Sequence, residues 1–346
     1  MNIKALTSAL VASLLTTPFA MAETTTTDFY GSLRIGIDSV DAGVKNDGAN
    51  GRDYLSRIGV KASTGLGNGL TGLGQVEYGL RSENSIDISQ NGQPTLRLAL
   101  VGLKGAFGEI YYGSQTPIFH KYVRSAYFSD GNDSVRLGTV REDDVTQYFY
   151  KGKDFSVAAG IQTEGQDGDD IDYYTFGGDY KTGPLTLQAA YVKDLRGDKN
   201  GELMGVRVWY RVTDALTLSA FRHQQDKTFD YSNGSSGDVQ LIDTNNSKLS
   251  GIPNCAGEDR STQGVYAGYR FGANLVHGRY AVDHCADAGD VTSGKVEYVR
   301  YLAKNYQVWV SYEALNNDKD RAPVTTVAGE TPDDMSEAQL GVRFDF

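Results

Sequence analysis

Four histidines, the side chains best suited to acid–base chemistry near neutral pH, are scattered along the chain. None stands in a motif with a serine or an aspartate that would complete a nucleophilic site. Isolated histidines in polar strands are usually solvated, so we expect these four to be exposed and the chain to have no catalytic residue. A barrel hydrolase is the alternative class, which hydrolysis of peptide or ester substrates would reveal. The four are His120, His223, His277 and His284.

Cys255 and Cys285, the two cysteines of the chain, both stand in polar, loop-like stretches. Together with the nearby His284 they fall short of the four suitably spaced ligands of a structural zinc site. The sequence therefore predicts no metal and no cofactor. In an exported chain such cysteines persist as disulfides, so we expect Cys255 to pair with Cys285, with free thiols as the alternative.

Residues 115–144 mix acidic, basic and aromatic side chains in a way that the rest of the chain does not. They follow a strand end at Ser114 and are longer than most connections. Taken alone, the segment is as consistent with a solvated surface loop as with a functional site. Its acidic candidates are Asp130 and Asp133, followed by Glu142 and Asp143, and its basic residues are Lys121, Arg124, Arg136 and Arg141.

Residues 1–22 have the pattern of a secretory signal peptide, with Lys4, an apolar run, Pro18, and small residues at Ala20 and Ala22. The apolar run is too short to anchor the chain in a bilayer. No later window approaches the roughly 18 to 20 apolar residues of a transmembrane helix. We therefore expect an exported chain whose mature part is residues 23–346.

Composition alone fits either an acidic secreted protein or a β-barrel. The mean hydropathy is −0.40, and the chain contains 41 Gly and 22 Tyr. A membrane barrel lowers hydropathy in this way because every second residue faces a wet lumen. The net charge of −11 argues against a nucleic-acid partner, since surfaces that bind phosphate are basic.

Apolar and polar residues alternate through the mature chain in units of about nine to twelve residues, which indicates half-buried strands. In residues 28–38, for example, Leu33 and Ile35 oppose Arg34. In the fourth unit, the leucines at positions 96, 98 and 100 are expected to share one face, opposite Arg97. Sixteen such units are present, and their length suits a tilted crossing of a bilayer better than a globular sheet.

Connections between these units alternate between short turns and longer polar loops, the arrangement of outer-membrane barrels. An even number of strands also closes a barrel without leaving an edge. The sequence therefore predicts an all-β fold, a 16-stranded antiparallel transmembrane β-barrel. The short turns are expected near residues 65–69, 104–106, 151–154, 182–184, 212–214, 272–273 and 303–305.

Five stretches, each a weak signal by itself, occur in order and at strand spacing: Asp28–Gly31, Ser56–Lys61, Gly74–Tyr78, Arg97–Lys104 and the C-terminal Phe346. On these motifs the whole mature chain resembles the trimeric general diffusion porins of Gram-negative outer membranes. The resemblance implies a homotrimer in contact with outer-membrane lipid and lipopolysaccharide. It also implies insertion by the barrel assembly machinery, for which the terminal phenylalanine is the signal.

In that family the third extracellular loop folds into the lumen, and here residues 115–144 hold its place. The loop's carboxylates would face a ladder of wall arginines across the narrowest point of the pore. Arg57 and Arg97 match two arginine positions, and Glu77 matches a lumen-facing glutamate. Arg34 faces inward by strand parity. The implied constriction thus has a basic side of Arg34, Arg57 and Arg97, with Asp130, Asp133 and Glu77 as its acidic members.

The resemblance implies a water-filled channel for the passive diffusion of ions and small hydrophilic solutes, with a size limit set by the constriction. The acidic balance of the whole chain favours a weak preference for cations. A sugar or oligosaccharide channel is the alternative, and it would need a track of aromatic rings. Candidates for such a track are Trp209, Trp309, Tyr122, Tyr127 and Phe128, although rings on a loop more often anchor it to a wall.

Overall fold

The computed structural model describes nine stretches of the chain, and the expected signal peptide lies outside them. No helix among the described residues is long and apolar enough to cross a membrane. The described stretches are residues 24–41, 48–80, 95–131, 135–163, 170–196, 200–229, 258–286, 289–317 and 334–346.

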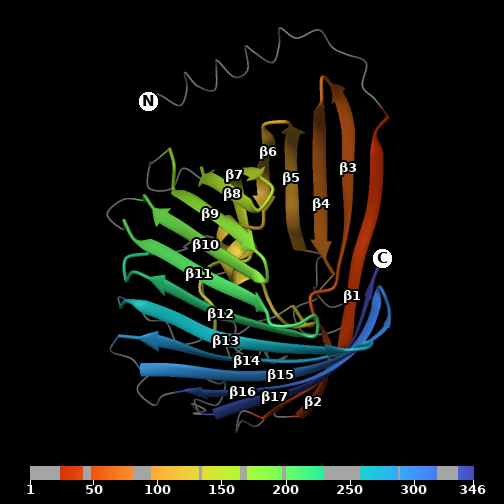
Figure 1. Cartoon of the computed structure of the whole chain (residues 1–346), viewed down its shortest axis with the longest axis vertical. Helices are drawn as coiled ribbons and strands as arrows, with labels where there is room; N and C mark the ends of the chain where they lie inside the picture. The colour runs from red at the N-terminus through yellow and green to blue at the C-terminus, as the bar shows by residue number, and fades with distance from the viewer. Residues whose placement is uncertain are drawn as a thin grey trace.

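Almost all of the described chain is β-strand, and each strand runs antiparallel to its neighbours in one sheet (Figure 1). One short π-helix, η1 (His120–Arg124), follows β6. The strands are β1 (Thr26–Asp41), β2 (Gly48–Asp53), β3 (Arg57–Gly67), β4 (Leu70–Gly79), β5 (Thr95–Gly105), β6 (Gly108–Gln115), β7 (Glu142–Lys151), β8 (Phe155–Gln162), β9 (Tyr173–Thr182), β10 (Leu185–Asp194), β11 (Glu202–Arg211), β12 (Leu216–Gln225), β13 (Arg260–Phe271), β14 (Asn274–Cys285), β15 (Gly289–Ala303), β16 (Tyr306–Asn317) and β17 (Asp334–Asp345).

Two of these segments form a single barrel strand. β3 pairs with residues 26–32 of β1, and β2 pairs with residues 35–40 of the same strand. The interruption lies at residues 54–56, where Leu55 has a φ of 66°. Because β2 and β3 follow one another along the same edge of β1, the segments make the closed 16-stranded barrel that the sequence predicts.

The barrel closes where the last strand meets the first, as expected from a chain that ends on a strand. Residues 336–345 of β17 pair with residues 32–41 of β1. Beyond this ladder, the Gly31 amide donates to the Phe346 carbonyl at 2.8 Å, and the Phe346 amide donates to the Gly31 carbonyl at 3.1 Å. Closure in this way pairs the first strand with the last, so the described sheet does not end at either of them, as a hydrocarbon environment requires.

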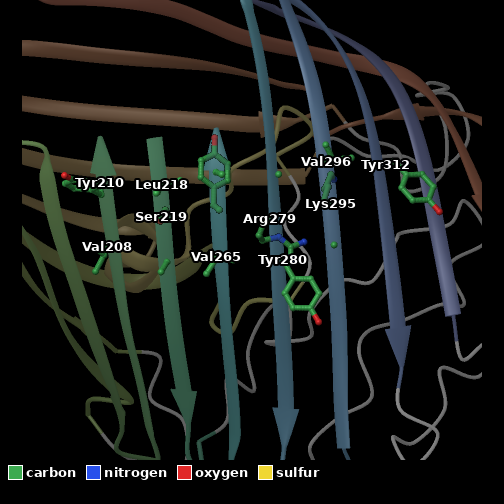
Figure 2. A pocket seen from close by; sticks show the side chains of 15 residues that line it. Val208, Tyr210, Leu218, Ser219, Val265, Arg279, Tyr280, Lys295, Val296 and Tyr312 are labelled. Atoms are coloured by element: carbon green, nitrogen blue, oxygen red, sulfur yellow. The ribbon is translucent and has the colours of Figure 1, made fainter. Parts of the chain in front are cut away.

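The two faces of the sheet differ sharply in polarity. Large apolar side chains such as Phe29, Ile37 and Leu340 are exposed on the outer face, while charged side chains such as Arg34 and Glu297 are buried inside. Figure 2 shows part of the outer face across β11 to β16, where aliphatic and tyrosine side chains lie around a shallow hollow. This is the distribution expected of strands that cross hydrocarbon around a polar interior.

The fourth predicted unit departs from simple alternation. In the β4–β5 ladder Glu77 pairs with Leu98 and Tyr78 pairs with Leu96, so Arg97 is an extra residue. A bulge of this kind shifts the side-chain alternation by one position. The prediction that leucines 96, 98 and 100 share a face is therefore wrong, since Leu96 is exposed on the outside together with Val101, while Leu98 and Leu100 are half-buried.

All seven short turns predicted from the sequence are present. They connect β3 to β4, β5 to β6, β7 to β8, β9 to β10, β11 to β12, β13 to β14 and β15 to β16. Glycine allows the tightest of them, since Gly183 and Gly272 have φ values of 54° and 56°. Because the strands alternate in direction, these turns share one end of the barrel.

We predict that Gly36→Ala weakens barrel closure. A Cβ at Gly36 would lie 2.1 Å from the Leu340 carbonyl oxygen of β17, so the two closing strands would have to separate. Overpacking of this kind costs about 1–3 kcal/mol. The measurement is thermal unfolding in detergent, followed by the heat-modified mobility of the barrel on gels.

Gly294→Ala is the matched control, because the nearest atom to a Cβ there is 4.0 Å away. Its unfolding temperature should equal that of the wild type. Equal unfolding temperatures for both variants would contradict the proposed close approach of β1 and β17.

Candidate functional site

The segment between β6 and β7 packs its apolar side chains against the inner face of the barrel. Ile118, Phe119 and Val123 are fully buried, in a cluster with Leu203 and Val192 of the wall. Figure 1 shows η1 behind β9 to β11, the strands that it contacts. Two wall glycines make room for it, since a Cβ at Gly177 would lie 2.6 Å from Ile118 and one at Gly205 2.8 Å from Val123.

Polar groups of the wall satisfy the carbonyl oxygens at the end of η1. Arg207 donates to the Tyr122 carbonyl at 2.7 Å and to the Ser125 side chain at 2.8 Å. The Nε2 atom of His223 lies 3.2 Å from the Val123 carbonyl. The last carbonyls of a helix have no partner within the helix, so these wall side chains fix where η1 ends.

Aromatic rings hold the next part of the segment. Tyr127 stacks on Tyr266 with 4.3 Å between ring centroids, and its hydroxyl lies 2.9 Å from the Ser219 hydroxyl. Phe128 stacks on His277 at 5.0 Å. These loop rings are therefore anchors to the wall, and Trp209 joins the same cluster at 5.2 Å from Tyr127.

Ser129 is bound by a buried carboxylate of β15. Its amide donates to Glu297 at 3.0 Å, and its hydroxyl donates to the same carboxylate at 2.7 Å. His277 lies 2.8 Å from Glu297 on the other side. Gln307 donates to the Ser129 hydroxyl at 2.9 Å, so backbone and side chain are both fixed.

The structure places Asp130 at the barrel wall, in a buried ion pair. Its carboxylate accepts from the Lys295 ammonium at 2.6 Å, and both side chains are 1% exposed. Lys295 also lies 3.4 Å from Glu313, which is 3.1 Å from Arg279. The charge predicted to face the pore at Asp130 is thus compensated by the wall.

The prediction that the histidines are exposed is wrong for three of them, His120, His223 and His277. His223 is fully buried and His277 is 3% exposed, because both contact the segment described above. His284 does lie on the surface, 2.5 Å from Asp290. Burial and the nearby Arg124 lower the pKa of His120 well below its usual value, so this imidazole is neutral at pH 7.

Three residues predicted from the sequence come together on the opposite side of the interior. Arg97 lies 2.7 Å from one oxygen of Glu77, and Arg57 lies 3.9 Å from the other. The Tyr30 hydroxyl also donates to Glu77 at 3.0 Å. One buried carboxylate therefore orients two guanidinium groups.

Arg34, also predicted, extends this group toward the place where β1 pairs with β17. Its Nε atom donates to Ser32 at 2.9 Å, and its electrostatic neighbours include Arg57 and Arg343. Arg343 is paired with Asp345 at 2.9 Å. Sequence reasoning did not select Arg343, although its inward parity in the last strand was a usable signal.

Arg141, just before β7, completes the basic group. Burial, together with the Arg97 and Arg57 guanidiniums, lowers the pKa of Arg141 to about 10. It therefore stays protonated at neutral pH. We call these five residues the arginine cluster: Arg34, Arg57, Arg97, Arg141 and Arg343.

The structure describes the remaining predicted site residues only in part. Asp133 and Cys255 lie outside the described residues, so the disulfide stays a prediction, although Cys285 is completely buried. Phe346 is exposed on the outer face at the seam. Among the described residues, no group of three or more His, Cys, Asp or Glu is placed to hold a metal ion.

Comparison with known proteins identifies the class. Residues 6–320 match the model of the Gram-negative porin family, so the chain belongs to that family, whose members reside in the outer membrane. An outer membrane porin of Bordetella pertussis is 29% identical over 212 residues, 50% of this chain and 54% of that protein. The chain thus spans about half the length of the curated relative that it matches.

Solved structures share the fold at low sequence identity. An anion-selective porin from Comamonas acidovorans superposes with a TM-score of 0.69 at 16% identity, over 93% of this chain and 100% of that one. OmpF of Salmonella typhi in complex with daunomycin gives 0.68 at 19%, over 92% and 97%. The trimer form of OmpT of Vibrio cholerae gives 0.64 at 18%, over 94% and 100%.

We predict that Lys295→Met loosens the loop and lowers stability. The variant leaves the Asp130 and Glu313 carboxylates buried without their ammonium, and removing one partner of a buried pair costs about 3–5 kcal/mol. Thermal unfolding and limited proteolysis between β6 and β7 measure the effect.

Lys193→Met is the matched control, because its pair with Glu202 at 3.0 Å is partly open to solvent, with the two side chains 14% and 36% exposed. A pair open to solvent contributes about 0–1 kcal/mol, less than a fully buried one. If both variants unfold at the same temperature, the ion pair of Asp130 with Lys295 does not hold the loop.

Proposed function

We propose that the protein forms a water-filled channel for passive diffusion of ions and small hydrophilic solutes across the outer membrane. The observation that carries this proposal is a closed barrel with an apolar outer face and a charged inner face. Family membership supports the same reading. Solutes cross such a lumen down their gradients, without a chemical step, and the narrowest point limits their size.

Residues 115–144 are proposed as the lumen-folded loop that forms the constriction. The support is the series of contacts of this segment with inward-facing side chains of β11, β12, β14 and β15. Because these contacts draw the loop to one side, the channel would pass between the loop and the arginines around Glu77, whereas Arg34 lies beside Gly131 of the loop.

The constriction is proposed to prefer anions, which reverses the expectation of a weak cation preference from the whole-chain charge. In the described part of the site, the five guanidiniums of the arginine cluster stand beside three carboxylates, Glu77, Asp345 and Asp130. The Asp130 charge is balanced by Lys295. Fixed charge around a narrow opening sets ion preference more strongly than charge on outer loops.

Reversal potential across a salt gradient tests this preference. We expect wild-type channels to favour chloride over potassium. The permeability ratio should fall several-fold toward one in Arg57→Gln and in Arg141→Gln, because each removes one positive charge from the opening.

Arg222→Gln is the charge-matched control. Arg222 is exposed on the outer face, where it donates to Gln263 at 2.9 Å. Its removal should leave the ratio unchanged. A cation preference in the wild type, or equal shifts in all three variants, would refute the proposed constriction.

The anion preference should be nearly constant from about pH 6 to about pH 9. A base whose pKa is lowered loses its proton only above that pKa, and the pKa of Arg141 is lowered to about 10. Reversal potentials recorded across this range provide the check; a loss of preference below pH 9 would implicate other groups.

A homotrimer is the proposed assembly, supported by the trimer form of the similar OmpT structure. One protomer would reach its neighbour through the loop of residues 83–94, which lies outside the described residues. Contacts with lipid and lipopolysaccharide, and recognition of Phe346 by the barrel assembly machinery, stay predictions. Native and heated gel mobility should show a trimer that dissociates on heating.

Neither competing class gains support from the described residues. The family and the fold indicate a channel, and His223 and His277 are engaged in holding the loop. For a sugar channel, the rings of Tyr127 and Phe128 would have to be free, yet they pack against Tyr266 and His277. We therefore favour the general channel over a hydrolase or a sugar-specific pore.

A further inference from the structure

A second polar cavity lies beside η1, apart from the arginine cluster. It has a volume of about 670 Å³ and is enclosed by η1 and the inner wall near the short turns after β5 and β7. Three lysines line it, Lys104, Lys121 and Lys151, together with the rings of Tyr111 and Phe149. The cavity thus combines positive charge with an aromatic wall.

The lysines are only partly neutralised within the cavity. Lys104 lies 2.8 Å from Glu109, whose carboxylate also accepts from the Tyr111 hydroxyl at 2.9 Å. Glu109 is the one carboxylate among the lining residues of the cavity. Three ammonium groups and one carboxylate leave an excess of two positive charges, which favours an anionic guest.

Lys121 is held in a defined place on this wall. Its ammonium donates to the Gln147 side chain at 3.2 Å and lies 4.1 Å from the centroid of Phe149. Tyr111 contacts Phe149 edge to face, with 6.2 Å between centroids. A positive charge therefore lies directly beside a pair of aromatic rings, which is suited to an anion with a flat apolar body.

Gln115 gives an independent sign of a missing partner. Its side chain is 1% exposed and lines the cavity, and its Nε2 group donates to the Val145 carbonyl at 3.0 Å. Its Oε1 atom has no hydrogen-bond partner among the described residues. A buried acceptor left unpaired is costly, so a guest that carries a hydroxyl donor would be stabilised here.

We propose that this cavity is a binding site for small aromatic carboxylates, in which the carboxylate pairs with Lys121, the ring packs on Tyr111 and Phe149, and a ring hydroxyl donates to Gln115. The inference rests on the proposed channel function, since the guest reaches the cavity through the lumen. Binding of the guest in this cavity would be specific and saturable, whereas diffusion through the rest of the lumen is non-specific.

Single-channel current in the presence of 4-hydroxybenzoate tests the proposal. We expect concentration-dependent block by this anion. Acetate, which lacks the ring, and 4-hydroxybenzyl alcohol, which lacks the charge, should block much less. Benzoate should be intermediate, because it lacks the donor for Gln115.

Lys121→Met keeps most of the length of the side chain and removes its charge, and it should weaken block about tenfold. Phe149→Leu should also weaken block, by removing the ring face. Lys181→Met is the control, since Lys181 is 64% exposed at another short turn and does not line the cavity.

The outcomes separate the site from the channel itself. Normal conductance in potassium chloride without block by 4-hydroxybenzoate would overturn the site and leave the channel standing. Absence of any conductance would overturn the proposed function first, and the site with it. Equal block in Lys121→Met and Lys181→Met would show that general positive charge, and not this cavity, attracts the anion.

Discussion

The ion pair between Asp130 and Lys295 is the contact on which the interior depends. The two charged groups lie 2.6 Å apart and are almost completely buried. Because a buried charge without its partner is strongly destabilising, the ion pair holds Asp130 of the loop against β15. Ser129 and Phe128, next to it in sequence, then meet Glu297 and His277.

Barrel closure supplies the surface against which the loop is held. The period of two places every second side chain inside, and the seam between β1 and β17 makes the interior continuous. The loop lies against strands β9 to β15, where arginine and histidine side chains of the wall contact it. The arginine cluster on β1, β3, β5 and β17 is left facing it, with Arg141 added from the end of the loop itself.

Sequence reasoning reached the architecture because alternation, strand length and turn spacing are local signals, and the 16-stranded barrel and its seven short turns are confirmed. It failed at Arg97, where a bulge changes the face of the following leucines and no local signal marks the extra residue. It also failed for His223 and His277, since burial there depends on a segment 100 or more residues away in the chain. The partner of Asp130 is equally remote, at position 295, and without an alignment no pattern connects the two.

The central claim is that the loop rests against the wall while the channel is open, and a reversible cross-link tests it most directly. A Cβ at Gly177 would lie 2.6 Å from the Cγ2 atom of Ile118, so Gly177→Cys combined with Ile118→Cys brings two thiols within disulfide range. We predict that oxidation links the loop, just before η1, to β9 and leaves the single-channel conductance equal to that of the reduced protein. Failure of the link to form, or a fall in conductance on oxidation that reduction restores, would show that the loop of the open channel lies elsewhere.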